Sequence, residues 1–329
     1  MRVLNGDDVR KALPMDAAIE AMKQAFAALS GGRAVVSLRL HLPVEQHDGV
    51  SLCMAALVQE EHAEALAVKV VSLFDRNPER HLPTLQAAVL ALEPDTGRPV
   101  ALLDGAALTA IRTGAASGAA TDLLARPDSR TAAVFGAGVQ ARTQLEAVCT
   151  ARRIETAWVW DPRPGAGEAL CREMGGRGPV PRDLRAADDA RQAVAEADVV
   201  CTATTSHTPV FADADLKAGA HVNAVGSYQP HVQEIPPETV ARALLVVDSR
   251  QAALEEAGDI IQPIKQGLIG PDHVHAELGE LVLGREQGRT SADQVTLFRS
   301  VGVAVQDAVA AREVCRRAEQ LGLGQEVQW

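Results

Sequence analysis

Short hydrophobic runs with polar turns between them dominate the first third of the chain, and they predict extended segments. The runs cover 37–42, 50–57, 65–74, 86–92 and 99–103, and clusters such as 94–97 (Pro-Asp-Thr-Gly) separate them. Apolar positions at helical spacing predict a helix over 16–29, before the strands, and a long alanine-rich helix over 104–124, after them. This part of the chain therefore predicts a mixed or antiparallel sheet with one or two helices.

From about residue 130 the pattern changes to short buried runs that alternate with helical stretches. The candidate strands are 131–135, 156–160, 199–202, 221–225 and 243–247. Such alternation is typical of a parallel, doubly wound sheet. The segment 300–321 is helical again, and we expect it to return to the N-terminal region. The predicted fold class is α/β, with a Rossmann-type domain over 123–302 and an α+β domain formed by 1–122 and 303–329.

A glycine turn at the start of the second region indicates dinucleotide binding. The run 131–135 leads into Gly136-Ala137-Gly138, and a helix then begins at Val139. This order lets the backbone approach a pyrophosphate, whose charge rests at the helix N-terminus. Ala141 occupies the third, packing-limited position of the pattern. Glycines alone also describe an ordinary tight turn, but the next apolar run ends at Asp161, 23 residues after Gly138. That spacing is close to the roughly 20 residues expected for the acid that binds the ribose hydroxyls.

The same region bears on which nicotinamide cofactor is used. Asp161 favours NAD(H), because a carboxylate repels a 2′-phosphate. Arg163 could instead turn toward such a phosphate, so NADP(H) stays an alternative. Thr202-Ala203-Thr204 ends a predicted strand, where the backbone and small side chains commonly face the nicotinamide half. Capping of the strand end is the alternative role for Thr204.

Composition and charge narrow the classes of partner. The net charge of −11 argues against a nucleic-acid partner, so an anionic substrate must be held by a few local cations. No apolar run approaches the roughly 18 residues of a membrane helix, and the first ten residues lack the apolar region of a signal peptide. The five cysteines are scattered, which indicates reduced thiols in a cytoplasmic protein. Cys149 and Cys201 are expected in the core. We expect His273 and His275 in a polar loop, with no metal site.

Five segments together make the chain recognisable. They are Val68-Lys69-Val70, Leu82-Pro83-Thr84, 109–115 (TAIRTGA), the glycine turn followed by Gln140, and 298–302 (FRSVG). In this order, and from Met1 to about Leu321, the chain resembles the ornithine cyclodeaminase and mu-crystallin family of nicotinamide-dependent enzymes. The resemblance implies that the N-terminal domain, completed by the C-terminal helix, binds substrate and forms a homodimer whose sheets join across the subunit interface.

The resemblance also implies site residues. Arg39, Lys69 and Arg112 match or lie near the positions that bind the substrate carboxylate, and Thr84 matches a substrate-binding threonine. Lys69 lies in an apolar strand where an unpaired charge is costly, so a buried ion pair is its alternative role. A surface position is the alternative for Arg112, whose planar guanidinium suits a carboxylate, and a strand start is the alternative for Thr84. The expected cofactor-binding residues are Thr113, Gly136, Ala137, Gly138, Val139, Gln140, Asp161, Arg163, Thr202, Ala203, Thr204, Val225, Gly226 and Val301.

One departure from the family pattern decides between reactions. Ornithine-deaminating members and some alanine-oxidising members have an aspartate where this chain has Tyr228, next to Ser227. A phenol, with a pKa of about 10, cannot replace that carboxylate at neutral pH. The chain therefore resembles the branch that reduces cyclic ketimines, such as Δ1-pyrroline-2-carboxylate and Δ1-piperideine-2-carboxylate, to L-proline or L-pipecolate. Arg112 and Lys69 are the expected catalytic residues, and Lys69 or an ordered water would supply the proton. Tyr228 is included among the substrate-binding candidates.

Three other functions stay open at this point. The first is alanine dehydrogenase or an enzyme that forms N-alkyl amino acids from a 2-oxo acid and an amine. The second is ornithine cyclodeaminase, in which NAD is recycled and ammonia is released. The third is a non-catalytic, crystallin-like binding protein, against which the intact Lys69 and Arg112 argue.

Overall fold

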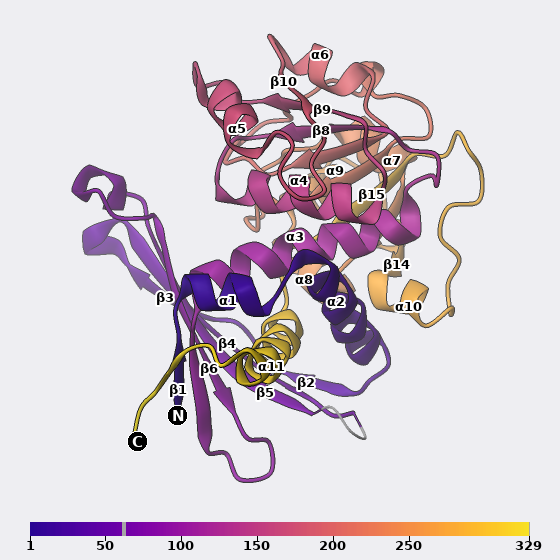
Figure 1. Ribbon diagram of the computed structural model, residues 1–329. Coiled ribbons are helices and arrows are strands. Elements are labelled where there is room, and N and C mark those ends of the chain that lie inside the picture. Colours follow the sequence, from indigo (N-terminus) through magenta and orange to yellow (C-terminus); the bar gives the residue numbers. More distant parts are fainter. Residues whose placement is uncertain (61–63, 329) are drawn as a thin grey trace. The chain divides into compact units, whose positions relative to one another are not determined.

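The computed structural model describes residues 1–60 and 64–328, and the chain divides into two compact units (Figure 1). Unit 1 comprises Met1–Arg112 and Val303–Trp329, and unit 2 comprises Thr113–Gly302. The first junction therefore lies between Arg112 and Thr113, in the first half of helix α3 (Gly105–Leu124), and not after residue 122, near the end of that helix, as expected. The reason is that the second half of α3 is bonded into unit 2, where the Thr121 hydroxyl accepts a hydrogen bond from Asn223. No helix in the described ranges is long and apolar enough to cross a membrane.

Unit 1 is built on an eight-stranded sheet among the residues that the structure describes. Its strand order is β16-β1-β7-β6-β5-β4-β2, with β3 also paired to β4. All pairs are antiparallel except β1 with β7, which confirms the mixed sheet. The strands are β1 (Arg2–Leu4), β2 (Ala34–Val36), β3 (Leu40–Val44), β4 (Gly49–Val58), β5 (Ala65–Phe74), β6 (Leu85–Leu92), β7 (Pro99–Asp104) and β16 (Gln325–Glu326).

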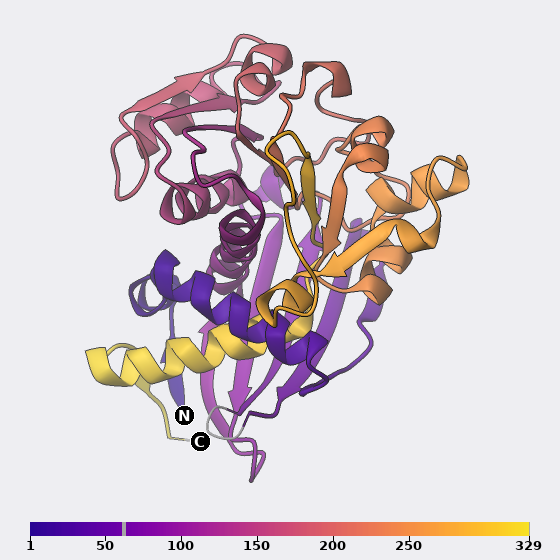
Figure 2. The ribbon, with the colours of Figure 1, turned by 90° about the vertical axis from the view of Figure 1, so that its right-hand side faces the viewer.

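Helix α11 (Ala304–Leu321) packs on one face of this sheet, against β4, β5 and β6. It lies beside α2 (Met15–Ser30), and the two helices are seen together in Figures 1 and 2. The shorter helices of this unit are α1 (Gly6–Ala12), η1 (Glu45–His47) and η2 (Asn77–Arg80). Because side chains alternate along a strand, Lys69 and Val71 of β5 face α11, whereas Val70 and Ser72 face away. The C-terminal helix thus covers only one face.

Unit 2 contains an eight-stranded parallel sheet, again counted over the described residues, with the order β10-β9-β8-β11-β12-β15-β13-β14. The order reverses between β8 and β11, and such a switch point is where doubly wound sheets bind dinucleotides. The fold class is therefore confirmed. The strands are β8 (Thr131–Phe135), β9 (Thr156–Trp160), β10 (Asp183–Ala186), β11 (Val199–Thr202), β12 (His221–Ala224), β13 (Leu244–Val247), β14 (Val274–Glu277) and β15 (Thr296–Arg299).

The helices of unit 2 are mostly short. They are α4 (Val139–Ala151), α5 (Ala166–Met174), α6 (Ala190–Ala195), η3 (Asp213–Asp215), α7 (Pro237–Arg242), α8 (Arg250–Glu256), α9 (Gly258–Lys265), η4 (Pro271–His273) and α10 (Leu278–Val282). Phe135, Val200, Val222 and Leu297, one from each of four adjacent strands, belong to one fully buried cluster. Central strands buried on both faces are expected in such a sheet.

Several sequence predictions need correction. The expected helix at 300–321 begins only at Ala304, because Ser300, Val301 and Gly302 are bonded to the Asp248 carboxylate. The polar loop expected around His273 and His275 is wrong in part, since Val274–Glu277 is strand β14. The Nε2 atom of each imidazole is hydrogen-bonded to a backbone carbonyl: His273 to that of Val240, and His275 to that of Gln287. Cys149 and Cys201 are buried free thiols, as predicted.

Candidate active site

A buried cluster of opposite charges lies between the sheet of unit 1 and helix α11. The Lys69 Nζ atom is 2.6 Å from Oδ2 of Asp307, and Arg112 Nε donates a 3.2 Å hydrogen bond to Oδ1 of the same carboxylate. Arg112 Nη1 also donates to Oε1 of Gln306, at 3.1 Å. The three charged side chains are at most 8% exposed. The structure thus brings Lys69 and Arg112 together, gives Lys69 its ion pair, and excludes a surface position for Arg112.

The charge balance of this cluster favours an anion. Burial lowers the pKa of Lys69 to about 8, opposed by Asp307 and assisted by Arg112 and Arg39. Burial alone would raise the pKa of Asp307, but Lys69 and Arg112 together hold it below its usual value. Two cations therefore share one carboxylate at neutral pH. The remaining positive charge can be neutralised by a substrate carboxylate, which suits a site for an amino or imino acid.

The neighbours of Lys69 in the sheet are apolar. Met54 of β4 and Val89 of β6 lie opposite Lys69 in register on either side, and both are buried. Arg39, in the connection before β3, is close enough to Lys69 to lower its pKa. Thr84 lies just before β6, where its carbonyl accepts a hydrogen bond from the Phe74 N–H. That position is five register steps along β6 from the Lys69–Val89 pair.

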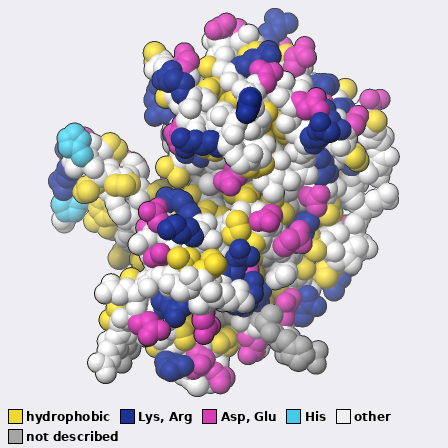
Figure 3. Space-filling model, viewed as in Figure 1, with side chains coloured by type: hydrophobic (Ala, Val, Ile, Leu, Met, Phe, Trp, Pro, Cys, Tyr) yellow, Lys and Arg dark blue, Asp and Glu magenta, His cyan; other side chains and the backbone are white. Residues whose placement is uncertain are grey.

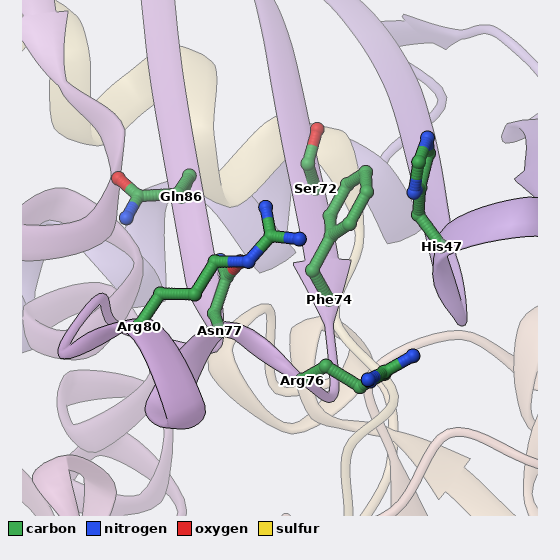
Figure 4. A pocket seen from close by; sticks show the side chains of 7 residues that line it. All are labelled: His47, Ser72, Phe74, Arg76, Asn77, Arg80 and Gln86. Carbon is green, nitrogen blue, oxygen red and sulfur yellow. The ribbon is translucent and has the colours of Figure 1, made fainter.

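A pocket on the opposite face of the same sheet is separate from this cluster (Figure 4). It is lined by His47, Ser72, Phe74, Arg76, Asn77, Arg80 and Gln86. Ser72 and Gln86 are paired across β5 and β6, and their side chains project from the face that Lys69 does not occupy. Arg76 is also paired with Glu79. The sheet therefore separates this pocket from the Lys69 cluster, whereas Thr84, opposite the pocket-lining Phe74, lies on the pocket side.

The glycine turn of unit 2 fits a pyrophosphate. Gly136 has φ 99°, a conformation that other residues rarely adopt, and a Cβ atom there would lie 2.6 Å from the Ala203 carbonyl oxygen. Helix α4 begins at Val139, and its N-cap, Gly138, supplies no side-chain hydrogen bond, so the first-turn N–H groups are available to an anion. Ala141 is fully buried, as its packing position requires. Arg142 donates hydrogen bonds to the carbonyls of Ala137 and Gly138 and so holds the turn.

Asp161, at the end of β9, is fixed beside this turn. One oxygen accepts a 2.8 Å hydrogen bond from the Ala137 N–H, and both oxygens accept from the Arg163 guanidinium. The hydrogen bonds from Arg163 are the main reason that the pKa of Asp161 is lowered, against the effect of burial. The Asp161 side chain is 4% exposed and that of Arg163 is 69% exposed. The structure thus joins the two residues on which cofactor preference depends.

The other predicted cofactor residues lie at the carboxyl ends of neighbouring strands. Thr202 ends β11 and Thr204 follows it, Val225 and Gly226 follow β12, and Val301 follows β15. The Thr204 hydroxyl donates a 2.6 Å hydrogen bond to the fully buried Glu234, so its side chain is held by a carboxylate and does not simply cap the strand. Further along the loop after Gly226, Ser227 is buried and Tyr228 is half-buried.

Sequence reasoning missed the buried acids that hold the candidate residues within each unit. Asp307 is one, and its signal was its place between the apolar residues Val305 and Ala308 of a predicted helix. Glu234, Asp248 and Asp259 are the others, each fully buried in unit 2, and Arg299 pairs with Asp259 at 2.7 Å. Over the ranges that the structure describes, no group of three or more histidine, cysteine, aspartate or glutamate residues could hold a metal ion.

These observations define a class of protein first. Unit 2 is a Rossmann-type dinucleotide-binding unit, and unit 1 carries a buried cationic cluster suited to a carboxylate. The family follows from comparison: the chain belongs to the ornithine cyclodeaminase/mu-crystallin family, whose model matches residues 2–321. The family prediction is confirmed.

Individual relatives agree with this assignment along the whole chain. A Δ1-pyrroline-2-carboxylate reductase of Bacillus cereus is 36% identical over 330 residues, covering 100% of both chains. The structure of the Thermococcus litoralis Δ1-pyrroline-2-carboxylate reductase in complex with NADH and L-proline is 43% identical. Its TM-score is 0.94, and the match covers 99% of this chain and 100% of that one. An archaeal alanine dehydrogenase dimer with bound NAD is 31% identical, with a TM-score of 0.91 and coverage of 100% and 99%.

Proposed function

We propose that this protein is an NAD(P)H-dependent reductase of cyclic ketimines, forming L-proline- or L-pipecolate-type amino acids. The observation that carries the proposal is the buried Lys69–Asp307–Arg112 cluster, in which two cations share one carboxylate. The natural complement of that cluster is a ketimine with a carboxylate next to its C=N bond. Relatives named as reductases of such a compound support the proposal, and so does Tyr228 in place of an acidic residue.

The residues of unit 2 would hold the cofactor. Gly136, Gly138 and the N-terminus of α4 would bind the pyrophosphate, and Asp161 the adenosine ribose. When bound, the nicotinamide supplies the hydride that the imine carbon accepts. The loops after β11 and β12, which contain Thr204 and Gly226, would border the nicotinamide half.

The residues of unit 1 bind the substrate and manage its proton. The Arg112 guanidinium and the Lys69 ammonium would hold the substrate carboxylate. Reduction of the C=N bond also requires that a proton be added to the nitrogen. We propose that Lys69 Nζ donates it, because its pKa of about 8 is close to neutral pH. Asp307 stabilises Lys69 in its charged form before transfer.

NADH is the cofactor that the chain would use preferentially. Asp161 is nearly buried, is held below its ordinary pKa, and would repel a 2′-phosphate. Arg163 would allow some activity with NADPH, because its exposed guanidinium can turn from Asp161 and bind the 2′-phosphate. The ratio of kcat/KM for the two cofactors measures this preference.

A homodimer is the assembly that we propose. Four apolar side chains, Val35, Leu40, Leu42 and Val70, lie on the sheet face opposite α11 and are 61%, 62%, 58% and 46% exposed. Figure 3, which has the view of Figure 1 with α11 in front of the sheet, shows hydrophobic side chains at the surface of the lobe of unit 1 that contains β3. Exposed apolar side chains gathered on one sheet face favour a protein interface, and a second copy would cover them. Light scattering after size-exclusion chromatography tests this proposal, because a homodimer has twice the 34.7 kDa mass of one chain.

The activity test follows the absorbance of NADH and NADPH with Δ1-pyrroline-2-carboxylate and Δ1-piperideine-2-carboxylate. Rapid oxidation with either imine supports the proposal, and the two rates compare ring sizes. Parallel reactions contain pyruvate with ammonia or methylamine, or ornithine. Activity only with pyruvate and an amine would indicate an alanine dehydrogenase or an N-alkyl amino acid enzyme. Ammonia release from ornithine without net NADH change would indicate a cyclodeaminase, and silence in every reaction would indicate a binding protein.

A further inference from the structure

The carboxylate of Glu234 lies beneath two loops of the cofactor unit and is bonded to both. Oε1 accepts hydrogen bonds from the N–H of Thr204, at 2.7 Å, and from its hydroxyl, at 2.6 Å. Oε2 accepts from the N–H of Gly226, at 2.7 Å, and from the Thr202 hydroxyl, at 3.4 Å. Thr202 is the last residue of β11 and Thr204 follows that strand, whereas Gly226 follows β12. One side chain therefore connects the carboxyl ends of two adjacent strands.

The fit around this carboxylate is close. A Cβ atom on Gly226 would overlap both Glu234 oxygens, so no other residue fits there without displacing the carboxylate. The backbone of Glu234 is itself fixed, because its N–H and that of Ile235 donate to Oδ1 of Asp259. Asp259 is paired in turn with Arg299, and both are fully buried. Glu234 thus rests on a rigid support and holds the loops from below.

We propose that Glu234, in its ionised form, is the positioning residue that fixes the loops after β11 and β12 for the nicotinamide half of the cofactor. This rests on the proposed function only in assigning a nicotinamide cofactor to unit 2. Asp161, at the end of β9, takes the adenosine side, so the other half of a dinucleotide extends over β11 and β12. Glu234 acts through Thr204 and Gly226 and does not itself react.

The hydrogen-bond pattern favours the ionised form. Each oxygen of Glu234 accepts one backbone N–H, which can only donate, and one threonine hydroxyl, and an ionised carboxylate accepts all four of these bonds. A glutamine would turn its amide NH₂ toward one of the two backbone N–H groups and lose that bond, and a protonated acid would lose the charge that strengthens all four bonds. Burial first, and then the charge of Asp259, raise the pKa of Glu234 to about 7, whereas Thr204 and Arg299 lower it. The loops should therefore loosen as the pH falls through neutrality.

The test compares Glu234→Gln with a matched control, Asp198→Asn. Asp198 is also a buried carboxylate that accepts two backbone N–H groups, those of Arg130 and Thr131, but it lies at the amino ends of β8 and β11. The dissociation constants of NADH and of ADP-ribose, which lacks nicotinamide, are measured by calorimetry. We expect Glu234→Gln to raise the Kd of NADH about tenfold, the loss of about one charge-assisted hydrogen bond. ADP-ribose should stay within about twofold, and Asp198→Asn should leave both ligands unchanged.

An equal loss for both ligands, or no loss for NADH, would overturn the proposal. If Glu234→Gln does not fold, the wild type decides: between pH 8 and 6 its affinity for NADH should fall about fivefold to tenfold, with ADP-ribose constant. A flat NADH profile refutes the idea. His207 and His231 stand on the same loops, with ring centroids 6.0 Å apart, so the double variant His207→Gln/His231→Gln must keep the profile. If it abolishes the profile, the histidines and not Glu234 are responsible.

These binding measurements use no imine, so the two proposals fail separately. A wild-type protein that binds NADH but reduces no ketimine would remove the proposed substrate and leave the role of Glu234 to be judged by the affinities. A wild-type protein that binds no NADH would remove both.

Discussion

Replacing Asp307 by asparagine removes the single carboxylate that Lys69 and Arg112 share. Both cations, whose side chains are at most 8% exposed, would then have lost the carboxylate that neutralises them. Loss of one partner of a buried ion pair typically costs about 3–5 kcal/mol of stability. Lys69 can avoid part of this cost by releasing its proton, because burial has already lowered its pKa to about 8 and Asp307 is what opposes a further fall. We therefore expect Lys69 to be largely neutral at pH 7.5 in this variant.

The catalytic consequence has a definite direction. A neutral Lys69 loses one charge-assisted hydrogen bond to the substrate carboxylate, worth about 1.5–3 kcal/mol, and loses the proton that it donates. The kcat/KM for Δ1-pyrroline-2-carboxylate should fall by roughly tenfold to a hundredfold at pH 7.5. The fall of kcat/KM at alkaline pH (the alkaline limb) reports the pKa of Lys69 in the free enzyme. The midpoint of this fall should therefore move from about pH 8 in the wild type to a lower pH in Asp307→Asn.

The assay is NADH oxidation over pH 5.5–9.5, with urea unfolding in parallel. Glu313→Gln is the control on the same helix, because Glu313 pairs only with the half-exposed Arg316 among the ion pairs described, and both measurements should stay near wild type. The opposite result is also informative. If Asp307→Asn lowers KM and leaves the alkaline limb unchanged, then Lys69 stays charged and simply gains attraction for the substrate, and the reasoning from its depressed pKa is wrong.

Three further predictions concern the cofactor turn, cofactor choice and assembly. Gly136→Ala should abolish NADH binding, because residue 136 has a positive φ and a Cβ atom there would collide with the Ala203 carbonyl. The control Gly97→Ala also has a positive φ, 71°, but its Cβ atom would meet no neighbour, so it should lower stability alone. Unaltered NADH binding by Gly136→Ala would contradict this geometry. Arg163→Ala should lower kcat/KM with NADPH at least fivefold and change kcat/KM with NADH less than twofold. The variant removes the proposed partner of the 2′-phosphate but keeps Asp161 for the ribose. An equal fall with both cofactors would contradict this role of Arg163. Val70→Asp should give a monomer in light scattering, because it buries a charge in the proposed interface, and a persistent dimer would place the interface elsewhere.

The sequence by itself determined the fold class, the family and most of the elements. The strand 65–74 and the glycine turn are local features: period-two alternation and a positive-φ glycine before an uncapped helix do not depend on distant residues. For the same reason the hydrophobic pattern predicted the strands at 131–135 and 156–160 with their observed bounds. Strand β15 was missed because only two of its four residues, Leu297 and Phe298, are apolar, and it ends in Arg299, whose burial only the ion pair with Asp259 makes tolerable.

Tertiary structure alone decided which charges meet. Asp307 is 238 residues from Lys69 in the chain, and only the packing of α11 on β5 joins them. Glu234 and Gly226 are also brought together by a loop that has no periodic pattern. A sequence pattern records which side of an element is buried, but not which element covers it. The partner of a buried charge, and therefore its pKa, is fixed only when distant segments pack together.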